Sequence, residues 1–234
     1  MHHRKDLFSR ALSADPGRLH FAAHSHHLWP DASYEGQVQA WTDANRHADR
    51  KWDLIFSEVV PEAQGHVARE LNLPSPDSVV FAPNTHDFLL RLFSGFERKP
   101  VRILSSDGEF HSFRRQGQRW EEAGEAEVTR IPLEPFDSFA DRFLEAARGG
   151  GFDWIVVSQV FFRTGQLFDR LAELAPLSDP AGPWVLVDGY HGFMATPTEL
   201  SGVADRLFYV AGGYKYAMAG EGACFLHAPP GFCP

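Results

Sequence analysis

From residue 78 onward the sequence alternates short apolar runs with amphipathic segments, and this alternation restricts the possible folds more than any other feature. The apolar runs predict seven strands: SVVFA (78–82), VRILSS (101–106), EVTRIPL (127–133), DWIVVSQV (153–160), PWVLVDG (183–189), RLFYVAG (206–212) and GACFLHA (222–228). Helix-like segments fill four of the intervals: 85–96, 111–124, 136–148 and 168–177. Such alternation is typical of a mostly parallel sheet covered by helices on both faces. We therefore expect an α/β fold with three αβα layers, in which shorter connections near the end allow one antiparallel strand.

The first 75 residues follow a different pattern. Apolar residues recur at helical spacing over 6–12, 31–52 and 56–72, and the last of these stretches runs into the proline-rich LPSP. The stretch LHFAAHSHHLWP (19–30) lacks this spacing and predicts an extended piece between the first two helices. The sequence therefore predicts a helical N-terminal segment over residues 1–75 and a sheet-containing domain over 76–234.

Composition limits the partners and the compartment. The chain has 234 residues, 44% of them hydrophobic, which is enough for a sizeable core. Acidic residues outnumber basic ones by 31 to 22, which disfavours a nucleic acid or an anionic membrane as the main partner. The two cysteines, Cys224 and Cys233, are too few for a disulfide framework. With neither a membrane-spanning run nor a signal-peptide core in the sequence, we expect a soluble cytoplasmic protein.

One lysine stands out near the end of the chain. In VAGGYKYAMAGEGACFL (210–226), Lys215 lies between two tyrosines in a stretch that is otherwise mostly glycine, alanine and apolar residues. A lysine is rarely buried without a partner, because removing an ammonium group from water costs several kcal/mol. Either Lys215 reaches solvent from a loop, or its charge serves a site.

Polar residues follow several predicted strands, where ligands of doubly wound sheets bind. Asp188 ends WVLVDG and His191 lies three residues further on. Asp188 could cap a turn, or it could hold a protonated ring nitrogen of a cofactor, with His191 close to the same ring. Asn84 and Thr85 open the helix after the first strand, either as an ordinary helix cap or as a phosphate site at a helix N-terminus.

Two more strand ends carry candidate residues. Phe110 follows VRILSS; it is a core residue by default, but a flat cofactor would need an aromatic ring to stack on. Ser158 ends DWIVVS and could donate to a phosphate or be an ordinary strand-end serine. The histidines of HSHH (24–27) do not predict a metal site, because alternate side chains of an extended segment point apart. We expect no metal ion, and a solvated or pocket-lining loop instead.

Five stretches taken in order carry a resemblance: NTHDFLLRLFSGF, EFHSF, VSQVFFRTGQLFD, VDGYHG and GGYKYAMAGEGACFL. They resemble the large domain of pyridoxal-phosphate (PLP) enzymes of fold type I in the class V aminotransferase superfamily, and most closely kynureninase. The sequence departs from kynureninases at Phe113, where an aspartate is usual, and in AMAGEGA (217–223), which replaces a stretch usually rich in asparagine and glycine. These departures affect the substrate assignment more than the cofactor assignment.

The resemblance implies a role for each candidate residue. Lys215 would form the Schiff base with PLP, and a lowered pKa in an apolar site suits that role. Tyr214 would contact the cofactor phosphate and assist proton transfers. Asp188 would pair with the pyridinium nitrogen, and His191 would lie near the same ring. The remaining implied cofactor contacts are Asn84, Thr85 and Ser158 at the phosphate and Phe110 on the ring.

The resemblance also implies an activity, namely a kynureninase-like hydrolase that cleaves the Cβ–Cγ bond of kynurenine or a related amino acid. A class V aminotransferase or a cysteine-desulfurase-like lyase is an alternative. The desulfurase would need a catalytic cysteine from elsewhere, since Cys224 lies in a predicted strand and Cys233 in the terminal tail. A third hypothesis is an inactive, truncated PLP-fold protein that acts by binding.

Two expectations concern the complete enzyme. Members of the superfamily carry a C-terminal small domain that supplies an arginine for the substrate carboxylate, and this domain is absent here. We therefore expect this chain to be weakly active or inactive by itself. Fold type I enzymes generally build their sites at a dimer interface, so we expect a homodimer with residues 24–27 and the glycine-rich segment after Lys215 near that interface.

Overall fold

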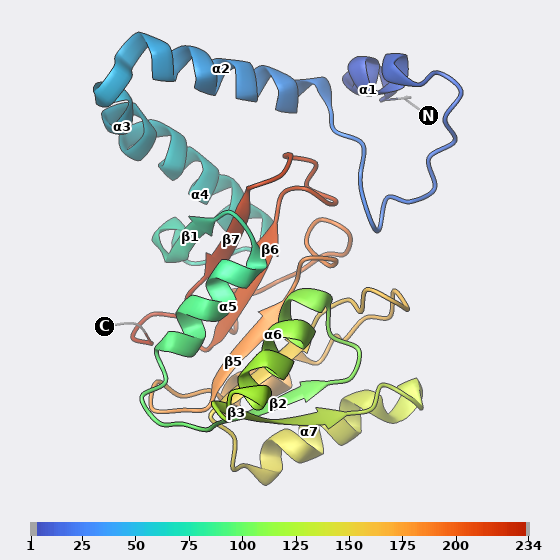
Figure 1. Ribbon diagram of the computed structural model, residues 1–234, viewed down its shortest axis with the longest axis vertical. Helices are drawn as coiled ribbons and strands as arrows, with labels where there is room; N and C mark the ends of the chain where they lie inside the picture. Colours follow the sequence, from blue (N-terminus) through green and yellow to red (C-terminus); the bar gives the residue numbers. More distant parts are fainter. Residues whose placement is uncertain (1–3, 233–234) are drawn as a thin grey trace.

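The computed structural model describes residues 4–232, so that Cys233 lies outside the described residues. All seven predicted strands form, and they join one sheet in the order β1-β7-β6-β5-β4-β2-β3 (Figure 1). Their bounds are β1 Val79–Ala82, β2 Val101–Ser106, β3 Ala126–Ile131, β4 Trp154–Ser158, β5 Trp184–Asp188, β6 Leu207–Gly212 and β7 Cys224–His227. β7 runs antiparallel to β1 and β6, and the other neighbouring pairs are parallel. The antiparallel strand is thus the last one.

The helices are α1 Ser9–Ala14, α2 Asp31–His47, α3 Lys51–Leu54, α4 Val60–Glu70, α5 Thr85–Ser94, α6 His111–Glu122, α7 Phe139–Gly149 and α8 Leu171–Leu174. A π-helical turn, Ile55–Val59, joins α3 to α4, so the helical run extends from Lys51 to Glu70. The helix predicted over 168–177 shortens to α8 and a 3-10 turn, Ala175–Leu177. Pro176 lies in this turn, and its missing N–H is incompatible with a continued α-helix.

Helices cover both faces of the sheet. In β4, Trp154 and Val156 pack with α5 and α6, whereas Ile155 and Val157 pack with α4, α7 and α8. This alternation follows from the two-residue period of a strand, and it explains why the strand is apolar throughout. The three-layer αβα prediction is confirmed.

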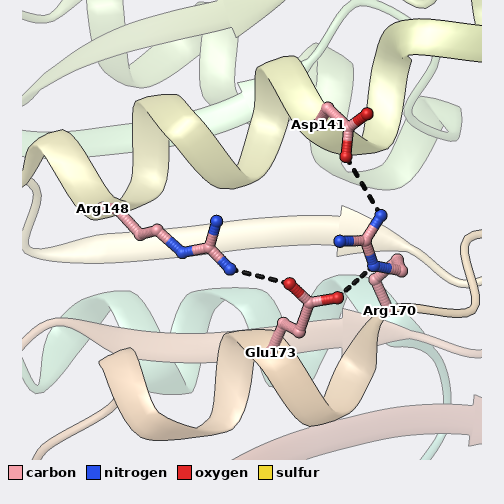
Figure 2. A network of polar contacts seen from close by, with 4 residues as sticks. All are labelled: Asp141, Arg148, Arg170 and Glu173. Atoms are coloured by element: carbon pink, nitrogen blue, oxygen red, sulfur yellow. Dashed lines mark hydrogen bonds and ion pairs between the residues drawn. The ribbon is translucent and has the colours of Figure 1, made fainter.

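An ion-pair network joins α7 to the region of α8 (Figure 2). Arg148 of α7 donates to Glu173 of α8 at 2.7 Å, and Arg170 donates both to Glu173 and, at 3.1 Å, to Asp141 of α7. Glu173 therefore receives two guanidinium groups, and they lower its pKa to about 2. The network ties together two helices of the same layer.

The helices α2 and α3, with the π-helical turn Ile55–Val59, form an arm that extends away from the sheet, and α4 leads from this arm to the sheet (Figure 1). α1, α2 and α3 contain no buried residue, whereas α4 buries Val67 and Ala68. Between α1 and α2, the chain descends toward the sheet and returns (Figure 1). Within residues 4–232, every helix is too short or too polar to cross a lipid bilayer.

Candidate active site

Six predicted site residues meet at the edge of the sheet where the parallel strands have their carboxyl ends. Together with Ser112 and Tyr190, they line a cavity of about 160 Å³. The six are Asn84, Thr85, Phe110, His191, Tyr214 and Lys215. They come from the loops after β1, β2, β5 and β6, so the sheet brings together residues far apart in sequence.

Lys215 follows β6 and is buried, with 2% of its surface exposed. Its Nζ donates hydrogen bonds to the backbone carbonyls of His24 at 3.3 Å and Ser25 at 3.1 Å. Burial lowers the pKa of the amine, and the nearby Asp188 carboxylate opposes this effect. The Lys215 amine therefore loses its proton more readily than an exposed lysine does.

Asp188 ends β5 with its side chain buried. Its Oδ1 accepts a hydrogen bond from the Tyr190 amide at 3.0 Å. Burial raises the pKa of the carboxyl to about 6, while the Tyr190 amide and the Lys215 charge favour the ionised form. Asp188 does not line the cavity, but the charge of Lys215 reaches it. A cationic group placed against this carboxyl would be held strongly.

His191 places a neutral imidazole in the cavity wall. Its ring centroid lies 4.7 Å from that of His24 and 5.4 Å from those of Phe110 and Phe162. Burial is the main cause of a pKa lowered to about 3, and the Lys215 charge adds to it. Its Nε2 is buried without a hydrogen-bond partner among the described residues. Buried polar atoms in folded proteins nearly always have partners, so this atom indicates room for a ligand.

The N-termini of two helices reach the same cavity. The Asn84 side chain caps α5 by accepting from the Asp87 amide at 3.1 Å, so Asn84 is a helix cap and also lines the cavity. Phe110 is the N-cap of α6 and provides no side-chain cap. Helix N-termini carry free amides and a partial positive charge, so this end of the cavity favours an anion.

Comparisons with known proteins address the fold. No protein-family model and no curated protein matches the sequence. Among solved structures, the chain is similar to a mutant of C-DES with glycine covalently linked to its PLP cofactor, with a TM-score of 0.79 and 17% identity over 98% of this chain and 60% of that one. It is also similar to the apo cysteine desulfurase from Thermococcus onnurineus NA1, with a TM-score of 0.74 and 18% identity over 99% and 58% of the two chains.

A third similar structure is the cysteine desulfurase CsdA from Escherichia coli, with a TM-score of 0.71 and 21% identity over 90% of this chain and 54% of that one. The chain has the fold of type I PLP enzymes. It spans 54% to 60% of the length of these three structures. The fold prediction is confirmed, and the particular likeness to kynureninase stays a prediction.

Ser158, like Asp188, is a predicted site residue that does not line the cavity. It is buried at the end of β4, and its hydroxyl donates to Oε2 of Glu109 at 2.6 Å. In this structure the hydroxyl hydrogen is bonded to Glu109, and the phosphate contact of Ser158 stays a prediction.

The sequence predicted a solvated or pocket-lining loop at residues 24–27 but gave His24 no individual role at the site. His24 Nε2 lies 3.1 Å from the Phe162 carbonyl oxygen, and His24 Nδ1 lies 3.1 Å from the Tyr216 hydroxyl. These contacts hold the segment around residue 24 over Lys215. The cluster of histidines in HSHH indicated a segment of interest. Local sequence patterns, however, do not predict that this segment contacts a lysine about 190 positions away.

The other histidines of HSHH point elsewhere. The His26 ring packs 5.9 Å from that of Trp29, and His27 Nδ1 lies 3.1 Å from the Leu28 carbonyl oxygen. No group of three His, Cys, Asp or Glu side chains among residues 4–232 is arranged to hold a metal ion. The side chains diverge although the backbone here is not extended as predicted: the Ser25 and His26 amides both donate to the Ala22 carbonyl and close a turn.

Tyr190 was also missed, although it lies within the quoted motif VDGYHG. Its ring lies 5.4 Å from that of Tyr214 and lines the cavity. A Cβ atom at Gly212 would lie 2.1 Å from the Tyr190 hydroxyl oxygen. Glycine at the end of β6 is therefore what lets Tyr190 take this position.

Two further residues bear on the reaction. Cys224 in β7 is fully buried, its Sγ donates to the Ala211 carbonyl at 3.1 Å, and burial raises its pKa to about 12. It is not a nucleophilic thiol.

Phe113, where kynureninases usually have an aspartate, packs edge-on against Trp154 with ring centroids 6.1 Å apart. Phe113 is thus a core residue and makes no contribution to the cavity wall.

Proposed function

We propose that this chain binds PLP and forms the cofactor-binding part of an enzyme that acts on an amino acid. One observation carries the proposal: the buried amine of Lys215 shares a cavity with two helix N-termini, and the Asp188 carboxyl lies within reach of its charge. The similarity to solved PLP enzymes supports it.

The residues present fit the cofactor. Lys215 would hold its aldehyde carbon, and Asp188 would hold its ring nitrogen. The N-terminus of α5, with Thr85, would hold the phosphate, and the hydroxyl of Tyr214 would assist. Phe110 and the unpartnered His191 would flank the ring. When bound, PLP withdraws electrons from the substrate α-carbon.

Because Lys215 Nζ donates to the carbonyls of His24 and Ser25, this loop must release the amine for it to react.

For the reaction, we propose β-elimination from a sulfur-containing amino acid. It belongs to the lyase class of the earlier alternative but, unlike the desulfurase reaction, needs no catalytic cysteine. The structural neighbours support this class, since one is a cystine C-S lyase complexed with its product cysteine persulfide. The Lys215 amine would take the α-proton, and the Cβ–S bond would break with sulfur as the leaving group. Cys224 argues against a persulfide held on this residue, because its thiol is buried.

Kynureninase-like hydrolysis is the second candidate, and a wall of aromatic rings that extends from the cavity residue Phe110 favours it. The rings of Phe110 and Phe162 lie 5.0 Å apart, and the His111 ring lies 5.9 Å from that of Phe162. Such a wall suits an aromatic substrate side chain. The order of FFRTGQLFD, VDGYHG and YKY in the sequence supports the same candidate.

We also propose a homodimer. Large apolar side chains are exposed along the arm: Trp41 at 70%, Trp52 at 50%, Phe56 at 66% and Val59 at 51%. Exposed apolar patches of this kind mark interaction surfaces. A second copy of the chain is the occupant that the expected assembly requires.

The test of cofactor binding is borohydride reduction in the presence of PLP, followed by intact-mass and peptide-mass measurement. We expect one reduced cofactor on Lys215 and none on Lys215→Ala. The matched control is Lys99→Ala, because Lys99 also has a pKa lowered by burial but packs on the Phe93 ring. It should label like wild type. Labelling that survives Lys215→Ala, or no labelling of wild type, would contradict the proposal.

Products then separate the two reactions. Incubation with cystine should yield pyruvate and persulfide sulfur if the chain is a lyase, whereas kynurenine should yield alanine and an aromatic acid if it is a hydrolase. Because the chain by itself is expected to be weakly active or inactive, trace products are measured after long incubation. Cofactor labelling without a product of either reaction would support cofactor binding and neither of the two reactions.

A further inference from the structure

A buried carboxyl lies behind the cavity and has no role in the proposal above. Glu109, in the loop between β2 and α6, has 6% of its surface exposed. Its Oε1 accepts from the Ser106 hydroxyl at 2.5 Å and its Oε2 accepts from the Ser158 hydroxyl at 2.6 Å. Neither partner carries a charge. Burying a carboxyl without a cationic partner is costly, so its retention calls for a physical reason.

Glu109 immediately precedes Phe110, whose ring lines the cavity. The loop that carries both residues is tightly held: a Cβ atom at Gly108 would lie 2.1 Å from Leu133 Cδ1. The Asp107 carboxylate also accepts from the Leu133 amide at 2.9 Å. The Glu109 hydrogen bonds add a connection to the end of β4, so the start of α6 and the ring of Phe110 are fixed relative to the sheet.

Glu109 is also connected to Asp188. Its partner Ser158 pairs in register with Asp188 across β4 and β5, and paired residues of neighbouring strands point to the same face. The pKa of Glu109 is raised to about 7: burial is the largest cause, the two serine hydroxyls act against it, and the Asp188 charge adds to it. The titratable group that faces Glu109 from β5 is Asp188, which in turn faces Lys215.

We propose that Glu109 is a positioning residue of this site: it fixes the Phe110 ring, and its protonation state sets the electrostatic field at Asp188. The proposal rests on the proposed function, in that Phe110 and Asp188 would hold the cofactor. Protonated Glu109 adds no charge behind the site. Ionised Glu109 adds a second negative charge, which favours the protonated form of any ring nitrogen held by Asp188.

The first experiment uses Glu109→Ala and Glu109→Gln and measures the PLP dissociation constant by absorbance titration. We expect Glu109→Ala to weaken binding about tenfold, because both serines lose their acceptor. Glu109→Gln keeps the shape and an acceptor, so it should restore binding to within about threefold of wild type. Glu121→Gln is the matched control, since Glu121 of α6 pairs with Arg130 away from the cavity.

A spectroscopic titration tests the electrostatic part. The pH dependence of the bound cofactor's absorbance should differ from wild type in Glu109→Gln, because this variant cannot acquire the second negative charge. In Glu121→Gln it should equal that of wild type. If Glu109 only held the loop in place, Glu109→Gln would keep the wild-type pH dependence. Wild-type affinity of Glu109→Ala, or an unchanged pH dependence in Glu109→Gln, would overturn the proposal.

A cofactor-free measurement separates this proposal from the proposed function. Urea unfolding of the apoprotein is compared for Glu109→Gln, Asp188→Asn and the double variant at about pH 5 and about pH 8. Both carboxyls have raised pKa values, so stability falls as pH rises from 3.8 to about 6 for Asp188 and from 4.5 to about 7 for Glu109. We expect each single variant to be more stable than wild type at the higher pH. There, the gain of the double variant should differ from the sum of the two single gains, whereas at the lower pH it should equal that sum. Additivity at both would refute the coupling even if wild type fails to bind PLP.

Discussion

Lys215 differs from a second lysine of the same chain in its surroundings. Burial lowers the pKa of Lys99 as well, and its Nζ lies 3.3 Å from the Phe93 ring centroid. Lys99 does not line the cavity of the candidate site, however, whereas Lys215 shares it with His191 and lies within reach of the Asp188 charge. A lowered pKa alone is therefore not a sign of a site; the combination of groups around Lys215 is.

The buried imidazole of His191 leads to a prediction about acid stability. Its pKa of about 3 lies below the ordinary value of 6.5, so the unfolded chain binds a proton as pH falls below 6.5 while the native site does not. His191→Phe removes this penalty. At about pH 5 it should stabilise the apoprotein relative to wild type by about 2 kcal/mol more than at pH 7. Urea midpoints at the two pH values measure the difference.

His66→Phe serves as the control for this measurement, because the His66 side chain is 65% exposed. It should leave the difference between the two pH values unchanged. An equal response of the two variants would mean that burial of His191 does not suppress its protonation in solution.

At the scale of secondary structure, the position of β7 decides the geometry of the site. β7 lies between β1 and β6 and runs antiparallel to both, so β1 points in the same direction as the other strands. The N-terminus of α5, which follows β1, therefore reaches the same edge as Lys215. Without this insertion the α5 N-terminus would not meet the lysine.

The ion-pair network of Figure 2 gives a prediction for the α7–α8 layer. Glu173→Gln removes one carboxylate shared by Arg148 and Arg170. We expect a modest fall in melting temperature that becomes smaller in high salt, because these charges are partly exposed and salt screens them. The pKa of Glu173 is about 2, so the contribution should also disappear as pH falls from about 4.5 toward 2.

Melting curves at low and high salt provide the measurement. Glu122→Gln is the matched control, since Glu122 pairs with Arg119 within the single helix α6 and connects no two elements. A Glu173→Gln variant that melts like Glu122→Gln in both salts would show that the network adds nothing to the packing of α7 against α8.

At the scale of the whole molecule, the N-terminal segment acts in two places. The piece around residue 24 descends onto Lys215, while α2 and α3 remain outside the core (Figure 1). The exposed aromatic side chains of the arm are the basis of the proposed homodimer. Dimerisation should therefore depend on the arm.

Light scattering over a dilution series tests this dependence. Wild type should have twice the mass of one chain, and Phe56→Glu should shift the equilibrium to monomers, because a charge would be buried at the interface. Leu90→Glu is the control: Leu90 of α5 is 42% exposed but lies away from the arm. Equal effects of both substitutions, or a monomeric wild type at all concentrations, would contradict the dimer.

The difference between predicted and unpredicted site residues has a physical basis. Asp188, His191 and Lys215 could be found because Asp188 ends a strand and the other two lie within three residues of a strand end, and strand ends of such sheets share an edge. Ser158 follows the same rule, yet its hydroxyl is bonded to Glu109. A strand-end serine can bond either to a ligand or to a protein group such as Glu109. The choice depends on the position of a neighbouring loop, which hydrophobic periodicity does not predict.

By itself, the sequence determined the seven strands, the helices between them and the N-terminal helical segment, because local apolar periodicity reports which faces of an element are buried. The tertiary structure alone decided the strand order, the contact of His24 and Ser25 with Lys215, and the placement of Glu109 behind Asp188. These features join residues distant in the chain, and their energies depend on burial and on hydrogen-bond partners that exist only once the sheet and its loops have assembled.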